Sequence, residues 1–198
     1  MPTTLPPLSS HDLATVERLT TARRSSLLVD REQPVPPELV ERLCGLVASA
    51  PNHKRTRPWR VAACTGVARA ALGGVWADAL ARAGTATEAK VAKTRTKYTR
   101  TPVVLVVGCA PDDDPFRHLE DRCAVAAGVQ NLLLGATAAG LASFWGSPPV
   151  PVCEEANALL GFGPGTTVIG AVYLGWPNAE PPPITREPVT VAWVGGGA

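Results

Sequence analysis

The most constraining feature of this sequence is an unbroken apolar run, Pro-Val-Val-Leu-Val-Val-Gly, over residues 102–108. A strand with one wet face would alternate apolar and polar residues, whereas a continuous β-branched run is typical of a strand that is covered on both faces. The chain must therefore supply two covering layers. Its 198 residues, 45% of them hydrophobic, are enough to build one domain around such a core.

The remaining patterns supply those layers. Apolar spacing predicts further strands over 59–64, 141–145, 168–174 and 189–194, and helices over 12–25, 37–50, 67–83, 121–139 and 153–160. This order predicts an α/β or α+β sheet with helices packed on both faces. We expect residues 1–10 to form a flexible arm and 11–198 a single domain.

Bulk properties narrow the choice of partner and compartment. A net charge of +2 is too small for mass electrostatic binding to nucleic acid or to an acidic membrane. No apolar run approaches the roughly 20 residues that span a bilayer, and the start lacks the features of a signal peptide. The five cysteines are scattered and odd in number, which predicts free thiols in a cytoplasmic protein with no metal site.

Arg23-Arg24-Ser25 lies where the first predicted helix ends. Two guanidinium groups and a hydroxyl suit a phosphate, because arginine presents fork-shaped donors. Arginines at a helix C-terminus also complement the helix dipole without any ligand. The spacing alone leaves both interpretations open.

Two other segments are rich in cations. The loop Pro51–Trp59 contains Asn52, His53, one lysine and two arginines between a predicted helix and a buried strand, where ligand contacts are expected. Lys90–Arg100 carries five cations, which suit either a phosphate-attracting rim or a solvated helix face. Tyr98 is its only aromatic residue, so a stacking platform for single-stranded nucleic acid is lacking.

Several kinds of chemistry are excluded. The glycines of 161–166 follow a predicted helix and precede a strand, the reverse of a dinucleotide-binding fingerprint, so we expect a turn with glycine caps. No G-x-S-x-G elbow and no H-x-x-x-H pair is present. Asp112-Asp113-Asp114 is interpreted as a solvated turn.

Taken together, the motifs resemble the nitroreductase family, and best its small subgroup with an A-P-x-H-K loop. The resemblance rests on motifs that follow one another in the expected order along nearly the whole chain. They are A-R-R-S (22–25), S-A-P-N-H-K (49–54), R-P-W-R (57–60), Q-N-L-L-L (130–134), G-L-A-S-F-W (140–145) and G-A-V-Y-L-G-W-P (170–177), followed by Arg186.

The resemblance implies an FMN-dependent oxidoreductase that transfers hydride from NADPH or NADH to a small flat acceptor, such as a nitroaromatic or a quinone. It also implies an α+β fold with a central mixed sheet flanked by helices, and a two-fold homodimer with exchanged C-terminal tails. Because the flavin N5 carries the chemistry, no catalytic side chain is expected. The implied flavin contacts are Arg23 and Arg186 to the phosphate, Arg24 and Ser25 to the ribityl chain and pyrimidine edge, Asn52 and His53 from the opposite subunit, and Trp145, Gly146 and Ser147 on the other face.

The sequence departs from the subgroup at two positions. An arginine usually follows the tryptophan matched by Trp145, and another usually precedes the A-P-x-H-K loop. Gly146 and Ser49 stand at these positions. The loss of two cations near the ring leaves open an alternative, a flavin-binding or flavin-handling protein without nicotinamide turnover.

Overall fold

The apolar run forms β2 (Val103–Cys109), a central strand in which every residue is buried. The computed structural model describes residues 8–195. In it β2 pairs with β1 (Trp59–Cys64) on one side and β4 (Thr167–Gly175) on the other, and β3 (Ala142–Gly146) adds to β4. The resulting four-stranded sheet has the order β1-β2-β4-β3.

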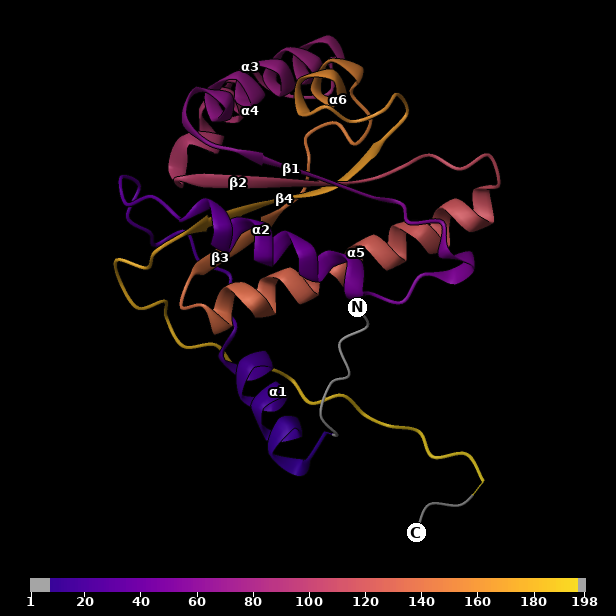
Figure 1. Ribbon diagram of the computed structural model, residues 1–198. Coiled ribbons are helices and arrows are strands. Elements are labelled where there is room, and N and C mark those ends of the chain that lie inside the picture. Colours follow the sequence, from indigo (N-terminus) through magenta and orange to yellow (C-terminus); the bar gives the residue numbers. More distant parts are fainter. Residues whose placement is uncertain (1–7, 196–198) are drawn as a thin grey trace.

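Helices cover both faces of this sheet (Figure 1). One face carries α2 (Pro37–Gly45), the short η1 (Leu46–Ser49) and the long α5 (Pro115–Ala138); the other carries α3 (Gly66–Arg82), α4 (Glu88–Thr96), η3 (Lys97–Arg100) and α6 (Glu154–Leu160). Alternate residues of β2 point to opposite faces. Leu105 therefore packs in the core under α5, and Val106 in the core under α3.

The sheet is less mixed than expected. All pairings between β1–β4 are antiparallel, and the parallel component is confined to a single bridge between Ser25 and Ser143. That bridge places the segment after the first helix along the outer edge of β3.

Helix α5 begins at Pro115, earlier than its apolar pattern indicates, because Asp114 caps it. The Asp114 carboxylate accepts hydrogen bonds from the backbone N–H groups of Phe116 and Arg117, at 2.9 and 3.3 Å. Asp112 in turn accepts from the Arg117 side chain, and this hydrogen bond lowers the pKa of Asp112 to about 2. The aspartate turn is therefore an N-terminal cap of α5 as well as a solvated loop.

Two smaller predictions, the free cysteines and the glycine-capped turn, are confirmed. All five cysteines are free, and Cys64, Cys109 and Cys153 are buried, although Cys123 is exposed. Burial raises the pKa of the Cys109 thiol to about 11. Gly161 ends α6 in the left-handed conformation, with a φ of 69°, as the glycine-capped turn requires. Within the described residues, no helix is both long and apolar enough to cross a membrane.

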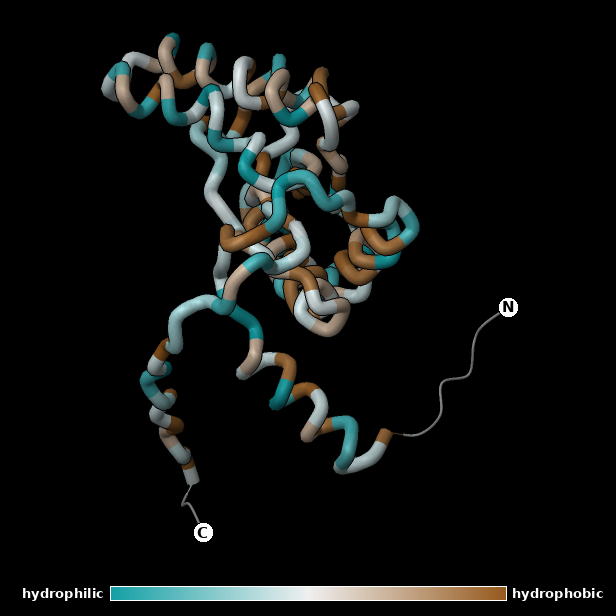
Figure 2. The backbone as a smooth tube through the Cα atoms, turned by 90° about the vertical axis from the view of Figure 1, so that its left-hand side faces the viewer, coloured by the Kyte–Doolittle hydropathy of each residue, from teal (hydrophilic) through white to brown (hydrophobic). Residues whose placement is uncertain are grey.

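Two segments project from the body of the molecule (Figure 2). Helix α1 (Ser10–Ala22) has no buried residue, and its Leu13 and Val16 are 62% and 54% exposed. The tail after Trp176 is extended and exposed along most of its length, with Trp193 79% exposed. The strand predicted over 189–194 does not form in this single chain, and residues 1–7 of the predicted arm lie outside the described part.

Gly128 sets how closely α5 approaches η1. A Cβ atom at Gly128 would lie 2.6 Å from the backbone oxygen of Val47. We predict that Gly128→Ala lowers the free energy of unfolding by about 1–3 kcal/mol, because this overpacking meets backbone that cannot move aside. Urea unfolding at fixed protein concentration measures the change.

Gly45→Ala is the matched control. Gly45 has helical dihedral angles and nothing within 4 Å of an added Cβ. Here the same change should raise stability, by up to about 1 kcal/mol, because alanine is the better helix former. Equal effects at the two glycines would contradict the close-contact account.

Candidate functional site

Three arginines meet at the C-terminal end of α1, although one of them is far away in the sequence. The Arg186 guanidinium donates from Nη1 to the Thr21 carbonyl at 2.9 Å and from Nη2 to the Arg23 carbonyl at 2.8 Å. Arg24 folds back onto the same helix end and donates to the Thr21 carbonyl at 2.5 Å. We call Arg23, Arg24 and Arg186 the arginine cluster.

Hydrogen bonds to backbone carbonyls hold the Arg24 and Arg186 side chains of the arginine cluster in place without neutralising them. A guanidinium has five N–H donors. Arg186 uses one donor on each of its two Nη atoms to bind the two carbonyls, so three donors remain. None of the three arginines forms an ion pair with a carboxylate in the part of the chain that the structure describes. The helix-dipole interpretation is therefore correct for the contacts seen, and donors remain for an anion.

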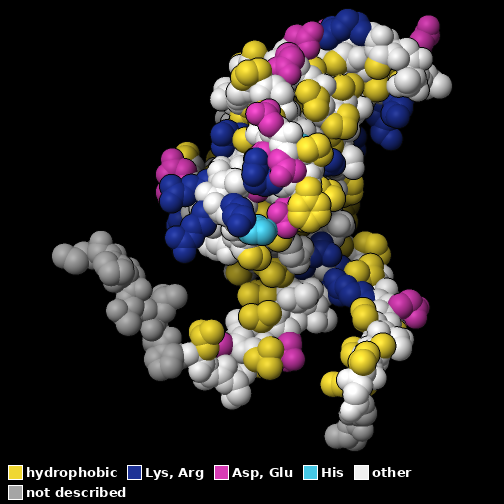
Figure 3. Space-filling model, turned by 90° about the vertical axis from the view of Figure 1, so that its right-hand side faces the viewer, with side chains coloured by type: hydrophobic (Ala, Val, Ile, Leu, Met, Phe, Trp, Pro, Cys, Tyr) yellow, Lys and Arg dark blue, Asp and Glu magenta, His cyan; other side chains and the backbone are white. Residues whose placement is uncertain are grey.

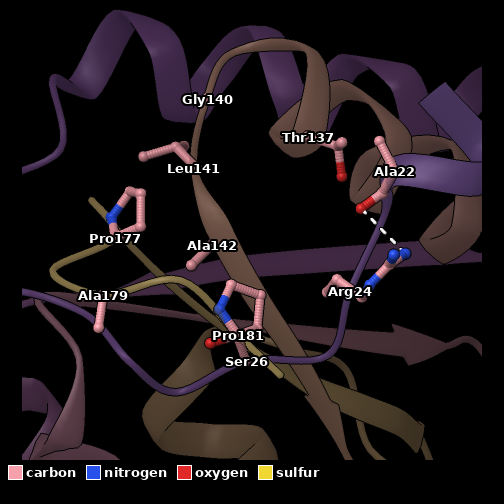
Figure 4. A pocket seen from close by; sticks show the side chains of 10 residues that line it. All are labelled: Ala22, Arg24, Ser26, Thr137, Gly140, Leu141, Ala142, Pro177, Ala179 and Pro181. Atoms are coloured by element: carbon pink, nitrogen blue, oxygen red, sulfur yellow. Dashed lines mark hydrogen bonds between the residues drawn. The ribbon is translucent and has the colours of Figure 1, made fainter. Parts of the chain in front are cut away.

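A pocket of about 190 Å³ opens beside the cluster (Figure 4). It lies between the end of α1, the last turn of α5 at Thr137, the start of β3 and the prolines of the tail. Its other lining residues are Ala22, Ser26, Gly140, Leu141, Ala142, Pro177, Ala179 and Pro181. This is a mostly apolar pocket with the Arg24 guanidinium in its lining.

Strand β3 connects the arginine cluster with the other residues predicted on this side. The Ser26 N–H donates to the Ser143 carbonyl at 2.8 Å, next to the Ser25–Ser143 bridge. Trp145 follows two residues later, about 7 Å further along the strand. The structure thus arranges Arg23–Ser25 and Trp145–Ser147 along one edge of the sheet.

Glycines shape the surface around Trp145. An added Cβ at Gly170 of β4 would lie 1.9 Å from the indole nitrogen of Trp145, so the absence of a side chain there lets the indole lie on β4. Gly146 is enclosed by aromatic rings: its added Cβ would lie 3.3 Å from Phe144 and 3.4 Å from Tyr173. Replacing Gly146 by the arginine of the subgroup would require Phe144 or Tyr173 to move.

The loop Pro51–Trp59 adopts an unusual backbone. Lys54, Arg55 and Arg57 have φ angles of 59°, 55° and 53°, in the left-handed region that residues other than glycine rarely adopt. Each costs roughly 1–2 kcal/mol. Such strain persists only where surrounding contacts impose it, and it is concentrated at functional sites.

Those contacts come from Asn52 and from a buried carboxylate on α5. Asn52 Nδ2 donates to Asp121 Oδ1 at 2.9 Å and to the Thr56 hydroxyl oxygen at 3.0 Å, while its Oδ1 accepts from the Arg57 N–H at 2.9 Å. The Thr56 hydroxyl also donates to Asp121, which is only 2% exposed. The amide of Asn52 is therefore engaged in holding the loop, and its predicted contact with a cofactor stays a prediction.

His53 lies at the far end of α5 from the arginine cluster. Its Nδ1 is 3.1 Å from the Glu120 carboxylate, and a hollow of about 470 Å³ beside it is lined by Pro51, Leu119, Cys123 and Ala127, among others. Glu120 and Thr137 are 17 residues apart on one straight helix, which separates them by about 25 Å. The two groups of predicted site residues therefore do not meet within one chain.

Sequence reasoning missed three residues that support the site. Asp121 falls inside an apolar helix, where a carboxylate at a core position was the available signal, whereas Glu120 is partly exposed and gave no such signal. Gly170 interrupts a β-branched strand, which marks a close approach by a neighbour. Their partners could not be identified without the tertiary contacts.

Comparison with known proteins gives the same family as the motifs do. The model of the nitroreductase family matches residues 20–176, about four-fifths of the chain. This chain belongs to the nitroreductase family. Among curated proteins, "Putative NAD(P)H nitroreductase YfhC" of Bacillus subtilis (strain 168) is 25% identical over 169 residues, which are 84% of this chain and 87% of that protein.

Solved structures confirm the fold. A nitroreductase-like family protein from Bacillus cereus has a TM-score of 0.77 at 24% identity, covering 98% of this chain and 100% of that one. A nitroreductase with bound FMN from Bacteroides fragilis NCTC 9343 has a TM-score of 0.73 at 23% identity, covering 94% and 100%. The FMN-dependent nitroreductase NfnB from Mycobacterium smegmatis, in complex with NADPH, has a TM-score of 0.64 at 20% identity, covering 84% and 89%.

The hydrogen bonds of Asn52 to the loop predict that removing them makes the loop easier to cleave by a protease. Asn52→Ala removes the contacts that impose the left-handed backbone, so trypsin should cleave after Lys54 and Arg55 several times faster than in the wild type. Mass spectrometry of timed digests locates the cuts. Asn131→Ala, which removes a single 3.4 Å bond to the Leu46 carbonyl elsewhere on α5, is the control. Unchanged cleavage in Asn52→Ala would show that the loop holds its shape without this side chain.

Proposed function

We propose that this protein is an FMN-dependent oxidoreductase that takes hydride equivalents from NADPH or NADH and passes them to a small flat acceptor, such as a nitroaromatic or a quinone. The observation that carries the proposal is the arginine cluster beside the pocket at the end of α1. Family membership supports the same conclusion, as do the relatives whose names include NAD(P)H and FMN.

The donors of the cluster suit the phosphate of FMN. A phosphate monoester carries about −1.5 to −2 charges near neutral pH, and two unpaired guanidinium groups can neutralise it with bidentate hydrogen bonds. Arg186 and Arg23 would hold this phosphate. Arg24 and Ser25 would hold the ribityl chain and the pyrimidine edge, where a guanidinium offsets negative charge.

Bound FMN supplies the hydride chemistry, so the protein needs no nucleophile or catalytic triad. The protein's own task is to bind, to orient and to exclude water. The apolar walls of the pocket and the indole of Trp145 on the neighbouring strand provide flat surfaces for this purpose.

One chain provides only half of such a site. Ligand pockets usually measure about 300–1,000 Å³, whereas the pocket beside the cluster measures about 190 Å³. The hollow beside His53, at the other end of α5, is the complementary half. We place each flavin between the arginine cluster of one chain and the His53 hollow of a second copy, in a two-fold homodimer.

The exposed apolar segments support this pairing. A helix without a buried residue is stabilised by what it packs against, and more than half of the surface of Leu13, of Val16 and of the tail residue Trp193 is exposed in a single chain. A second copy of the chain would bury them. Packing of the exchanged tail on the second copy would also keep Arg186 against α1 of its own chain, where the structure has it.

Neither Gly146 nor Ser49, which stand where the subgroup has arginines, brings a cation to the flavin ring. Gly146 lies against Phe144 and Tyr173, and Ser49 is an exposed residue at the end of η1. The proposed acceptor is therefore uncharged rather than anionic, because a negative group would find fewer partners there than in the subgroup.

The phosphate assignment predicts a difference between two flavins. Arg186→Ala should weaken FMN binding by about tenfold or more, since one charge-assisted contact contributes roughly 1.5–3 kcal/mol. Riboflavin, which lacks the phosphate, should bind the wild type and the variant equally. Flavin fluorescence titration measures both. The control is Arg18→Ala, which removes an exposed arginine of α1 that lies one turn before the end of that helix. Equal loss of both flavins would contradict a phosphate role.

The dimer predicts an effect of charge on α1. Leu13→Asp combined with Val16→Asp should shift the protein towards the monomer in sedimentation velocity and weaken FMN retention, because carboxylates resist burial. Val67→Asp is the control: Val67 is 89% exposed on α3, in the layer on the other side of the sheet. A monomeric wild type, or a double variant that stays dimeric, would refute the role of α1.

A further inference from the structure

The loop that carries His53 presents cations that the structure does not use. Lys54, Arg55 and Arg57 are exposed, and none lies within ion-pair distance of a carboxylate among residues 8–195. The nearby carboxylates are engaged elsewhere, since Glu120 contacts His53 and Asp121 accepts from the loop itself. Figure 3 views this side of the molecule and shows Lys and Arg side chains gathered beside a histidine.

These cations are presented on a fixed backbone. All three residues have positive φ angles, and the bonds of Asn52 to Asp121 and to the Arg57 N–H impose that conformation. Arg60 braces the loop from the adjoining strand by donating to the Arg57 carbonyl at 3.4 Å. A preorganised set of guanidinium groups binds a phosphate at a lower entropic cost than a flexible one.

Arg95 of α4 and Lys97 of η3 do not compete for this role. Arg95 forms an ion pair with Asp78 at 2.5 Å, and Lys97 lies 5.0 Å from the centre of the Tyr98 ring. Helix α4 also packs on α3, on the face of the sheet opposite to α5 (Figure 1). The phosphate-attracting rim considered for Lys90–Arg100 therefore fits the His53 loop better.

If the loop cations bind a phosphate, that phosphate belongs to a molecule other than the flavin. The single phosphate of the flavin is assigned to the arginine cluster, so the remaining anionic reactant in the proposed function is the nicotinamide nucleotide. NADPH differs from NADH by one phosphate on the adenosine ribose, which carries about −1.5 to −2 charges. Arg55 and Arg57 lie within four residues of His53, the residue proposed to lie against the flavin, and so border the site that the nicotinamide must enter.

We propose that Arg55 and Arg57, flanked by Lys54, bind the 2′-phosphate of NADPH and make this protein prefer NADPH to NADH. This inference rests on the proposed function for its meaning in turnover. The phosphate recognition itself can be measured without any flavin chemistry.

The test variant is Arg55→Gln combined with Arg57→Gln, which removes two charges and keeps long polar side chains. The control is Lys90→Gln combined with Lys93→Gln, which removes the same charge from α4. The first measurement is calorimetric binding of adenosine 2′,5′-bisphosphate, with adenosine 5′-monophosphate as the probe that lacks the 2′-phosphate. The second is kcat/KM for NADPH and for NADH with a quinone acceptor.

The wild type and the α4 control should bind the bisphosphate more tightly than the monophosphate and turn over NADPH faster than NADH. In the test variant both preferences should fall about tenfold or more, with kcat/KM for NADH unchanged. Equal losses for NADPH and NADH, or a wild type without preference between the two adenosine probes, would overturn the inference. Loop-dependent bisphosphate binding without turnover of either nucleotide would support it while refuting the proposed function.

Discussion

The burial of β2 on both faces is the constraint on which the rest of the structure depends. A strand whose residues are all buried needs an apolar layer above and below it, and the chain supplies α3, α4 and α6 on one side and α2 and α5 on the other. Covering the second face requires α5 to be long, and its length separates the arginine cluster from His53. The two groups of predicted flavin contacts therefore lie at opposite ends of α5 within one chain, and the proposed homodimer would bring them together.

The site is built from segments that have little structure of their own. Arg186 lies in an extended tail, and it reaches the end of α1 because the exposed carbonyls of a helix C-terminus attract a guanidinium. The His53 loop is bent against its backbone preferences and is held by one buried carboxylate. In both cases a few polar bonds place cations where the sheet and helices alone would not.

The layers could be predicted from the sequence because they depend on apolar period and length. The β-branched run of β2 and the apolar stretch of α5 have few alternative interpretations, and both are confirmed. The start of α5 cannot be predicted from its apolar pattern, because the capping aspartate Asp114 and the polar first turn of the helix look like a solvated loop in the sequence. The positive φ angles of Lys54, Arg55 and Arg57 could not be predicted, since lysine and arginine carry no turn signal. The meeting of Arg186 with Arg23 came only from the family resemblance, because no local pattern links residues so far apart in the sequence.

An anaerobic absorption experiment tests the central claim, that this chain binds FMN and accepts reducing equivalents from a nicotinamide. The purified protein is loaded with FMN, freed of excess flavin, and titrated with NADPH and then NADH in the absence of oxygen. The account predicts retained flavin absorption that bleaches as nicotinamide is added. Retained flavin that no nicotinamide bleaches, or a protein that retains no FMN at all, would contradict it.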